Sequence, residues 1–249
     1  MIHSAVILAA GRGTRLGALG ALHPKGFIEL GGEAIIETSL ARLAHAGITR
    51  IVIVSGHLDE FYQALARRHP EVTLIHNPNY AESGSMVSLS LAQAALREDF
   101  LLLESDLIYE QRALTTLLAA ATPNTLLVSG PTGSGDEVYV EAADGRLTGL
   151  SKRRDELAGE VIGELVGITR LTPACLDAMC RHAAEVFRAT LHLEYEQALV
   201  AAGRGVPVIC KLVGDLAWSE IDDAQHLERA RSRVYPAILE NDRRYQPQP

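Results

Sequence analysis

The stretch Ala5-Val-Ile-Leu-Ala-Ala-Gly-Arg-Gly-Thr-Arg15-Leu16, followed seven residues later by Pro24-Lys25, decides the fold and locates the predicted site. Its first four residues are apolar and predict a buried strand, which Gly11 and Gly13 then interrupt. Glycines let successive backbone N–H groups face an anion, and Arg15 and Lys25 add two positive charges. The stretch therefore predicts a polyphosphate-binding turn; an ordinary strand-to-helix turn with surface charges is the alternative.

Two well-known nucleotide-binding motifs do not fit this turn. The dinucleotide-binding fingerprint requires a third glycine where Leu16 stands. A P-loop requires Gly-Lys-Ser/Thr, which the sequence does not contain at this point. The nature of the phosphate ligand must therefore be inferred from the rest of the chain.

The composition is that of a globular protein. The 249 residues are 47% hydrophobic and 22% charged, and we expect one large domain. A net charge of −8 argues against nucleic acid as the main partner. Cys175, Cys180 and Cys210 lack metal-ligand spacing, which predicts reduced core thiols. The sequence has no apolar run near about 18 residues and no leader-like start, so we expect a cytoplasmic protein without membrane contact.

Short apolar strands alternate with helices in the first half of the sequence. Strands are expected over 5–8, 51–54, 72–75, 100–103 and 125–129, and helices over 35–46, 59–69 (capped by Asp59), 85–96 and 111–121. Uninterrupted apolar strands are buried on both faces, which predicts an α/β fold with a doubly wound, mostly parallel sheet. Ligands bind beyond the carboxyl ends of such strands, where the glycine turn lies.

The pattern changes after Asp136. We expect a β-meander around Asp144-Gly145, strands over 164–171 and 206–212, helices over 173–187, 193–202 and 223–241, and a polar, frayed tail over 243–249. The whole chain, 1–249, is expected to form a single domain with parts at about 1–130, 131–222 and 223–249.

Carboxylates that could bind a metal occur at two places in the sequence. Asp106 follows the apolar strand 100–103, and Glu220 and Asp222 are two residues apart, which puts them on one face of an extended segment. Mg²⁺ accompanies triphosphates and takes one or two carboxylates from a protein, so Asp106 is a candidate ligand, and Glu220 and Asp222 are a second source of carboxylates. Helix capping is the alternative, with Asp223 the favoured cap of the last helix.

The run Gly-x-Gly-Thr-Arg-Leu with Pro24-Lys25 resembles the signature of the nucleotidyltransferases (pyrophosphorylases), which join an NTP to a phosphorylated small molecule. Gly84-Ser-Met, Leu103-Glu-Ser-Asp106 and Asp136-Glu-Val-Tyr139 look like the 2-aminoethylphosphonate cytidylyltransferases, relatives of the phosphocholine enzymes. The resemblance implies a Rossmann-like nucleotidyltransferase fold with a small β-rich acceptor-binding insertion. In it, the first part of the chain binds nucleotide and the second part binds the acceptor.

The same resemblance assigns roles around the nucleotide. From its residues alone, 77–88 is a loop with a helix N-cap; the resemblance makes it the base and ribose pocket. The implied catalytic residues are Arg15, Lys25 and Asp106, and the implied Mg²⁺ ligands are Asp106, Glu220 and Asp222. The implied nucleotide-binding residues are Leu8, Ala9, Ala10, Gly11, Gly13, Thr14, Arg15, Lys25, Gly84, Ser85 and Ser88.

The acceptor side is implied to contain a phosphate-gripping Lys152 and the aromatic-acidic pair Tyr195-Glu196. Solvated surface charge and an ordinary amphipathic helix are the respective alternatives. The implied acceptor-binding residues are Asp136, Glu137, Tyr139, Lys152, Tyr195, Glu196 and Trp218, with Glu194 beside them. Carboxylates suit an ammonium group better than a hydroxyl-rich sugar.

The predicted function is transfer of CMP from CTP to a small amine-bearing phosphonate, above all 2-aminoethylphosphonate, with release of pyrophosphate. Phosphocholine is the second acceptor, a sugar 1-phosphate the third, and a non-catalytic nucleotide sensor the alternative of another class. Expected partners are CTP, Mg²⁺ and a phosphonate or phosphate acceptor, with no nucleic acid or membrane and a homodimer as one possible state. Residues 17–23 depart from the commoner Pro- and Thr-containing loop of the family.

Overall fold

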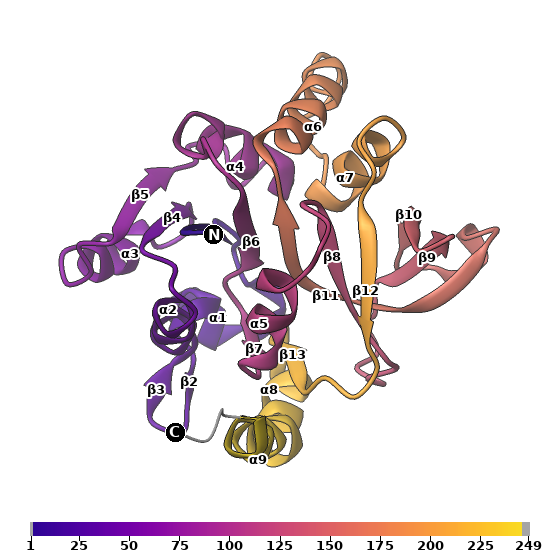
Figure 1. The fold of residues 1–249 in the computed structure, drawn as a ribbon. Helices are drawn as coiled ribbons and strands as arrows, with labels where there is room; N and C mark the ends of the chain where they lie inside the picture. Colours follow the sequence, from indigo (N-terminus) through magenta and orange to yellow (C-terminus); the bar gives the residue numbers. More distant parts are fainter. Residues whose placement is uncertain (1, 246–249) are drawn as a thin grey trace.

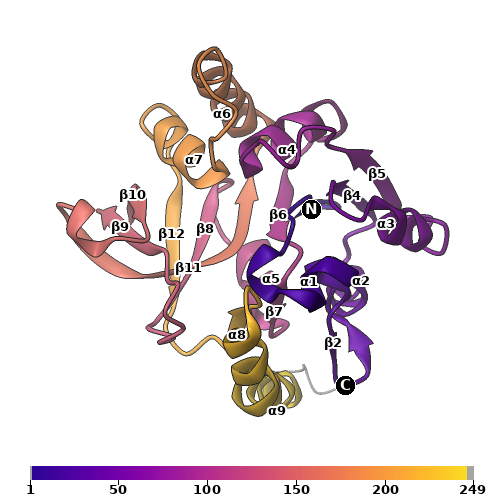
Figure 2. The same cartoon turned by 180° about the vertical axis from the view of Figure 1, so that it is seen from behind.

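The structure is a computed structural model and describes residues 2–245 (Figure 1). Its centre is a nine-stranded sheet in the order β5-β4-β1-β6-β11-β8-β12-β10-β9. The strands are β1 (Ser4–Ala9), β4 (Arg50–Ser55), β5 (Val72–His76), β6 (Phe100–Glu104), β8 (Thr125–Ser129), β9 (Tyr139–Ala143), β10 (Arg146–Ser151), β11 (Glu160–Leu171) and β12 (Ile209–Val213). Figure 2 shows β9 and β10 at the opposite edge of the molecule from β4 and β5.

The sheet is mixed, which corrects the expectation of a mostly parallel one. Strands β5, β4, β1 and β6 pair in parallel, and so do β8 and β12. Strand β11 lies antiparallel between β6 and β8, and it also pairs antiparallel with β9. An apolar run such as 165–168 shows that a strand is buried but does not show its direction, so the sequence pattern could not reveal this reversal.

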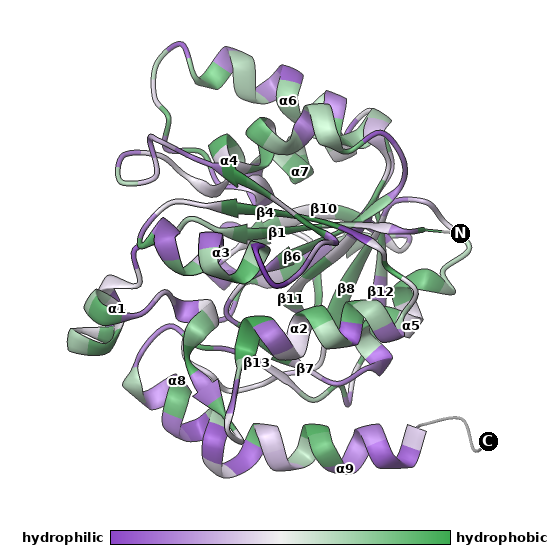
Figure 3. Cartoon of the chain, turned by 90° about the vertical axis from the view of Figure 1, so that its left-hand side faces the viewer, coloured by the Kyte–Doolittle hydropathy of each residue, from purple (hydrophilic) through white to green (hydrophobic). Residues whose placement is uncertain are grey.

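Helices cover both faces of the sheet, as a doubly wound arrangement requires (Figure 3). Neighbouring residues of a strand therefore enter different cores: Val6 and Leu8 pack on one side, and Ala5 and Ile7 on the other. The first face carries α4 (Ser85–Ala92), α6 (Pro173–Val186) and α7 (Tyr195–Gly203); the second carries α2 (Ile35–His45), α3 (Asp59–Ala66) and α5 (Arg112–Leu118). No helix within residues 2–245 has both the length and the apolar character needed to cross a bilayer.

A short antiparallel ladder that the sequence analysis missed connects two distant segments. Strand β7 (Leu107–Tyr109) follows Asp106 directly and pairs with β13 (Trp218–Glu220). Each strand has only three residues, too few for a period-two pattern to be visible. This ladder places the carboxylates near position 106 beside those near 220.

The C-terminal helical region is longer and less regular than expected. Its pieces are α8 (Ala224–Arg229), a π-helical segment (Ala230–Val234) and α9 (Tyr235–Tyr245). They pack on the glycine turn, α1 (Ala18–Leu22) and the hairpin of β2 (Glu29–Leu30) with β3 (Glu33–Ala34), in a third core. The expected frayed tail is helical as far as Tyr245, and its remaining residues, 246–249, lie outside the described residues.

Several predicted boundaries change at the local level. Leu58 rather than Asp59 is the N-cap of α3, and the Asp59 carboxylate instead accepts hydrogen bonds from Ser55 and Gln63. The helix expected from residue 85 leaves regular α geometry after Ala92 and continues as a 3₁₀ turn. Asp223 caps α8 as expected, accepting from the backbone N–H of His226 at 2.8 Å.

Candidate active site

Two adjoining cavities open at the carboxyl ends of β1 and β6. The first has a volume of about 190 Å³ and the second about 350 Å³. Four carboxylate residues line both cavities: Glu104, Asp106, Glu194 and Glu196. An α/β sheet binds ligands beyond the carboxyl ends of its parallel strands, where the glycine turn lies, so this pair of cavities is the candidate site.

The glycine turn follows β1 directly. Gly13 has a left-handed backbone (φ 61°), which allows the chain to enter the 3₁₀ turn Thr14–Leu16. Of the predicted nucleotide-binding residues here, Leu8, Ala10 and Gly11 line the first cavity, and Ala9 packs in the core beneath the sheet. Gly13 and Thr14 line neither cavity, and Arg15 projects into the second.

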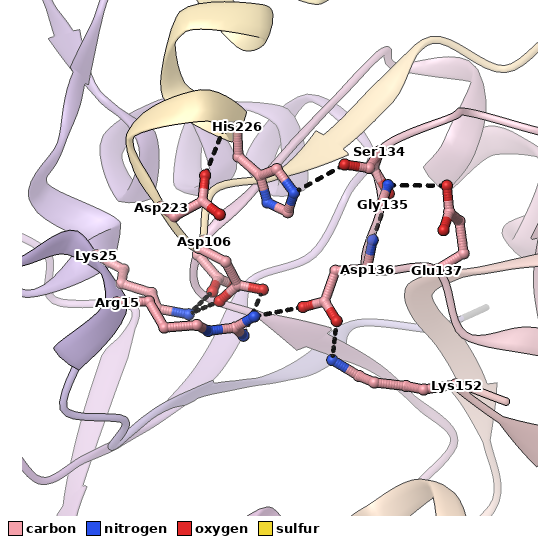
Figure 4. Close-up of polar contacts among 11 residues, drawn as sticks. Arg15, Lys25, Asp106, Ser134, Gly135, Asp136, Glu137, Lys152, Asp223 and His226 are labelled. Carbon is pink, nitrogen blue, oxygen red and sulfur yellow. Dashed lines mark hydrogen bonds and ion pairs between the residues drawn. The ribbon is translucent and has the colours of Figure 1, made fainter.

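A continuous chain of ion pairs crosses the second cavity (Figure 4). Lys25 Nζ donates to Asp106 Oδ2 at 2.7 Å and also to Asp222. Arg15 joins Asp222 at 2.8 Å and Asp136 at 2.5 Å, and Lys152 Nζ lies 2.7 Å from the other oxygen of Asp136. Both cations predicted at the nucleotide and the cation predicted at the acceptor therefore meet in one network.

The network sets the protonation of its members. Burial opposes the charge of Lys25, but Asp106 and Asp222 outweigh it and raise the pKa of this lysine above its usual value. Burial likewise works against the charge of Asp136, yet Lys152 and Arg15 lower its pKa to about 2. Lys25 and Asp136 are therefore both ionised at neutral pH.

The β7–β13 ladder brings the three predicted metal ligands together. Glu220 lies opposite Leu107, and the backbone N–H of Ile221 donates to the Asp106 carbonyl at 3.1 Å. Burial and then the charges of Asp222 and Asp106 raise the pKa of Glu220 to about 8. A hard divalent cation fits such a set, because it prefers oxygen ligands and would relieve the repulsion among crowded carboxylates.

Segment 77–88 forms the wall of the first cavity and the start of α4. Asn77 Nδ2 donates to Ser83 Oγ and Ser88 Oγ, at 3.2 and 3.0 Å. A Cβ on Gly84 would lie 2.3 Å from the Leu193 carbonyl oxygen, so only glycine fits there. The Ser85 hydroxyl donates to Glu194 at 2.6 Å. These contacts join α4 to the segment that begins α7.

Tyr195 and Glu196 are adjacent in the sequence, but their side chains have different surroundings. Tyr195 is fully buried, and its hydroxyl donates to Glu104 at 2.7 Å, so it supports the wall between the cavities. Burial and the charge of Glu196 raise the pKa of Glu104 well above its usual value. Burial and the charge of Glu194 raise the pKa of Glu196 to about 7. Glu196 Oε2 is buried without a hydrogen-bond partner among the described residues.

The remaining predicted acceptor residues divide between neighbouring spaces. Asp136, Glu137, Lys152 and Trp218 line the second cavity. Tyr139 lines a separate hollow of about 400 Å³ together with Glu137 and Arg154. Trp218 is thus the aromatic side chain that the structure places in the second cavity, and carboxylates dominate the rest of its wall.

The structure adds site residues that were not predicted. Glu104 ends a wholly apolar strand just as Asp106 follows it, which was an available signal. His226 lies four residues after Asp222 on the first turn of α8, within reach of Glu220. Ser105 and Ser134 also line the cavities, and Asn77, Tyr80 and Ser83, which lie in the segment 77–88 expected to form the base and ribose pocket, line the first.

At the carboxyl ends of its strands, this α/β sheet has a glycine turn, paired cations and a carboxylate cluster. These features define an anion-binding domain of the nucleotide-binding class. The chain belongs to the MobA-like NTP transferase domain family, whose model matches residues 5–234.

Curated relatives include cytidylyl-transferring enzymes. The chain is 32% identical over 245 residues to the CMP-5'-(3-aminopropyl)phosphonate synthase of Streptomyces rubellomurinus, covering 93% of this chain and 39% of that protein. It is 37% identical over 106 residues to the 2-aminoethylphosphonate cytidylyltransferase of Lancefieldella rimae, covering 42% of this chain and 43% of that protein. The chain thus spans less than half the length of these relatives.

The fold has close structural counterparts. The inositol-1-phosphate CTP transferase of T. maritima superposes with a TM-score of 0.81 at 22% identity, covering 96% of each chain. At this identity the likeness establishes the nucleotidyltransferase-type fold. The predicted recognition of the family is thereby confirmed at the level of family and α/β architecture.

Proposed function

We propose that this chain transfers CMP from CTP to a small amine-bearing phosphonate, most favourably 2-aminoethylphosphonate, and releases pyrophosphate. The observation that carries the proposal is the meeting of the two cavities at one cluster of opposite charges. Residues of about 1–130 would bind the nucleotide, and residues of about 131–222 the acceptor. The names of the two phosphonate relatives support this choice of acceptor.

The chemistry needs little proton transfer. A phosphate-type acceptor already carries an oxyanion at neutral pH, since its second pKa is about 6. In the proposed step this oxygen forms a bond to the α-phosphorus of CTP, and the bond to the pyrophosphate oxygen breaks. Arg15 and Lys25 would neutralise the charge that develops on the leaving pyrophosphate. Catalysis is then positioning and charge neutralisation, with no general base required.

The proposed metal is Mg²⁺, held by carboxylates of Asp106, Glu220 and Asp222. When bound, it supplies positive charge to the phosphate oxygens. The chain's own contribution is the β7–β13 ladder, which fixes the relative position of these side chains before substrates bind. Lys25 contacts two of them, so it would orient the same carboxylates from the other side.

The wall of the second cavity favours a primary ammonium on the acceptor. A primary ammonium has three N–H donors and is satisfied by carboxylates, whereas a quaternary ammonium is best held by several aromatic faces. Glu196 offers a buried oxygen without a partner among residues 2–245, and Trp218 supplies aromatic surface. Lys152 would bind the phosphonate group at the other end of the acceptor.

The test is a pyrophosphate-release assay with four NTPs and a panel of acceptors. We expect turnover with CTP and 2-aminoethylphosphonate, with a kcat/KM at least about ten-fold above that for phosphocholine, which corresponds to about 1.4 kcal/mol. A phosphocholine value ten-fold higher would reverse the acceptor assignment but keep cytidylyl transfer. Turnover only with a sugar 1-phosphate, or CTP binding without pyrophosphate release, would contradict the proposal.

A further inference from the structure

His226 lies beside the carboxylates at the end of β13, although the sequence analysis gave it no role. One ring nitrogen of His226 and one oxygen each of Glu220 and Asp222 all lie within 4.8 Å of one another. Two ligand atoms that share an ion at about 2.1 Å are at most about 4.2 Å apart, so only small shifts would let these three groups meet one ion.

The hydrogen bonds of the imidazole show which nitrogen is available. His226 Nε2 lies 3.2 Å from the carbonyl oxygen of Ser134, which can only accept, so Nε2 carries the proton. In the neutral ring Nδ1 is then an acceptor with a lone pair. Nδ1 is buried without a hydrogen-bond partner among the described residues, in a side chain that is only 4% exposed. Figure 4 shows Nε2 directed at Ser134 and Nδ1 directed away from it.

This is the arrangement of a metal-ligating histidine. Such a histidine usually donates its other N–H to a backbone carbonyl or carboxylate, which fixes the tautomer and the ring orientation. Asp223 fixes the backbone as well, because its side chain accepts from the His226 N–H at the start of α8. The backbone N–H and the Nε2 atom of His226 are therefore both hydrogen-bonded, and the lone pair of Nδ1 remains available to a cation.

We propose that His226 Nδ1 is a ligand of the divalent ion at this site, together with Glu220 and Asp222. The inference rests on the metal site of the proposed function and adds a nitrogen to an oxygen-only set. Imidazole favours first-row transition metals, whereas Mg²⁺ strongly prefers oxygen. We therefore expect His226 to strengthen the binding of Mn²⁺, a first-row ion, more than the binding of Mg²⁺.

Metal binding at His226 also bears on the acceptor side. Ser134 lies two residues before Asp136, which holds both Arg15 and Lys152. The carbonyl that orients the imidazole therefore belongs to the same segment that engages these two cations. One segment, 134–136, therefore contacts both the proposed metal ligand His226 and the two cations proposed to bind phosphate groups.

Mn²⁺ is the probe, and its coupling to nitrogen is the readout. We expect ¹⁴N electron spin-echo modulation from Mn²⁺ bound to the wild-type chain. H226Q should abolish this coupling and weaken Mn²⁺ binding at least about ten-fold, with a smaller effect on Mg²⁺. H69Q is the matched control, because His69 also contacts two carboxylates, of Glu37 and Glu71, on another part of the protein.

Two results would overturn the assignment: bound Mn²⁺ without nitrogen coupling in the wild-type chain, or coupling and affinity unchanged in H226Q. The absence of nitrogen coupling in the wild-type chain overturns the assignment even where H226Q does not fold, and its presence is assigned to His226 by its loss in H226Q and not in H69Q. Cytidylyl transfer is assayed separately. Transfer without nitrogen coupling would remove His226 and leave the proposed function standing, whereas coupling without transfer would do the reverse.

Discussion

Lys25 Nζ lies 2.7 Å from Asp106 Oδ2, so the lysine proposed to face pyrophosphate and the aspartate proposed to bind metal are paired with each other. The pair is largely buried, and Lys25 has a second partner in Asp222. Removing Lys25 takes the paired cation away from the buried carboxylate of Asp106, whereas removing Asp106 leaves Lys25 with Asp222. Changes at these positions therefore test both the charge balance of the site and the proposed chemistry.

Asp106→Ala is expected to lower kcat at least about 100-fold, because it removes a major electrostatic group from the reacting centre. The measurement is steady-state turnover at saturating Mg²⁺, with thermal unfolding as a check that the variant is folded. Asp99→Ala is the control, since Asp99 pairs with Arg170 at 3.2 Å and lines neither cavity. Near-normal turnover of the Asp106 variant would leave that residue a structural role only.

Lys25→Ala should lower kcat more than Lys152→Ala does, because Lys25 is the one of these two lysines proposed to contact the reacting triphosphate. Lys152→Ala should mainly raise KM for the acceptor, which is the sign of lost uniform binding. Arg153→Ala is the control: it is a neighbouring exposed cation paired with Asp155 at 2.9 Å. A rise in KM for CTP alone in the Lys152 variant would contradict its acceptor role.

Glu196 should give the acceptor reaction a dependence on pH. Burial and Glu194 raise the pKa of Glu196 to about 7, so this carboxyl becomes neutral as the pH falls below that value. A neutral carboxyl holds an ammonium poorly, and we expect kcat/KM for 2-aminoethylphosphonate to fall below about pH 7. Glu196→Gln should remove this limb of the profile and raise the acceptor KM about ten-fold or more. An unchanged profile in the variant would show that another group titrates.

Gly84→Ala should destabilise the protein by about 1–3 kcal/mol and weaken CTP binding, because its Cβ would lie 2.3 Å from the Leu193 carbonyl oxygen. Chemical denaturation and CTP titration measure the two effects. Gly205→Ala is the matched control, since its nearest neighbour would lie 3.9 Å away. Equal stability of the two variants would mean that α4 can move away from Leu193 without loss.

The main strands, and the position of Asp106 just after one of them, could be predicted because an apolar run such as 100–103 indicates a buried strand. The sequence could not reveal the direction of β11, because an apolar run looks the same in either direction. Tyr195 and Tyr139 were both assigned to the acceptor. The first supports a wall through Glu104 and the second faces another hollow, a distinction that depends on contacts between distant segments. His226 was missed because its significance depends on Ser134, 92 residues away.

Strand β11 has a mechanical consequence. Its twelve residues pair with β6 and β8 at one end and with β9 at the other, so one continuous strand joins the proposed nucleotide half to the acceptor half, with shifts in register between Leu165 and Thr169 and between Val161 and Gly163. A hinge between the halves would have to break the pairing of that strand. We therefore expect them to move as one rigid body, which leaves the opening and closing of the site to the segments outside these strands, 10–23 and 130–138.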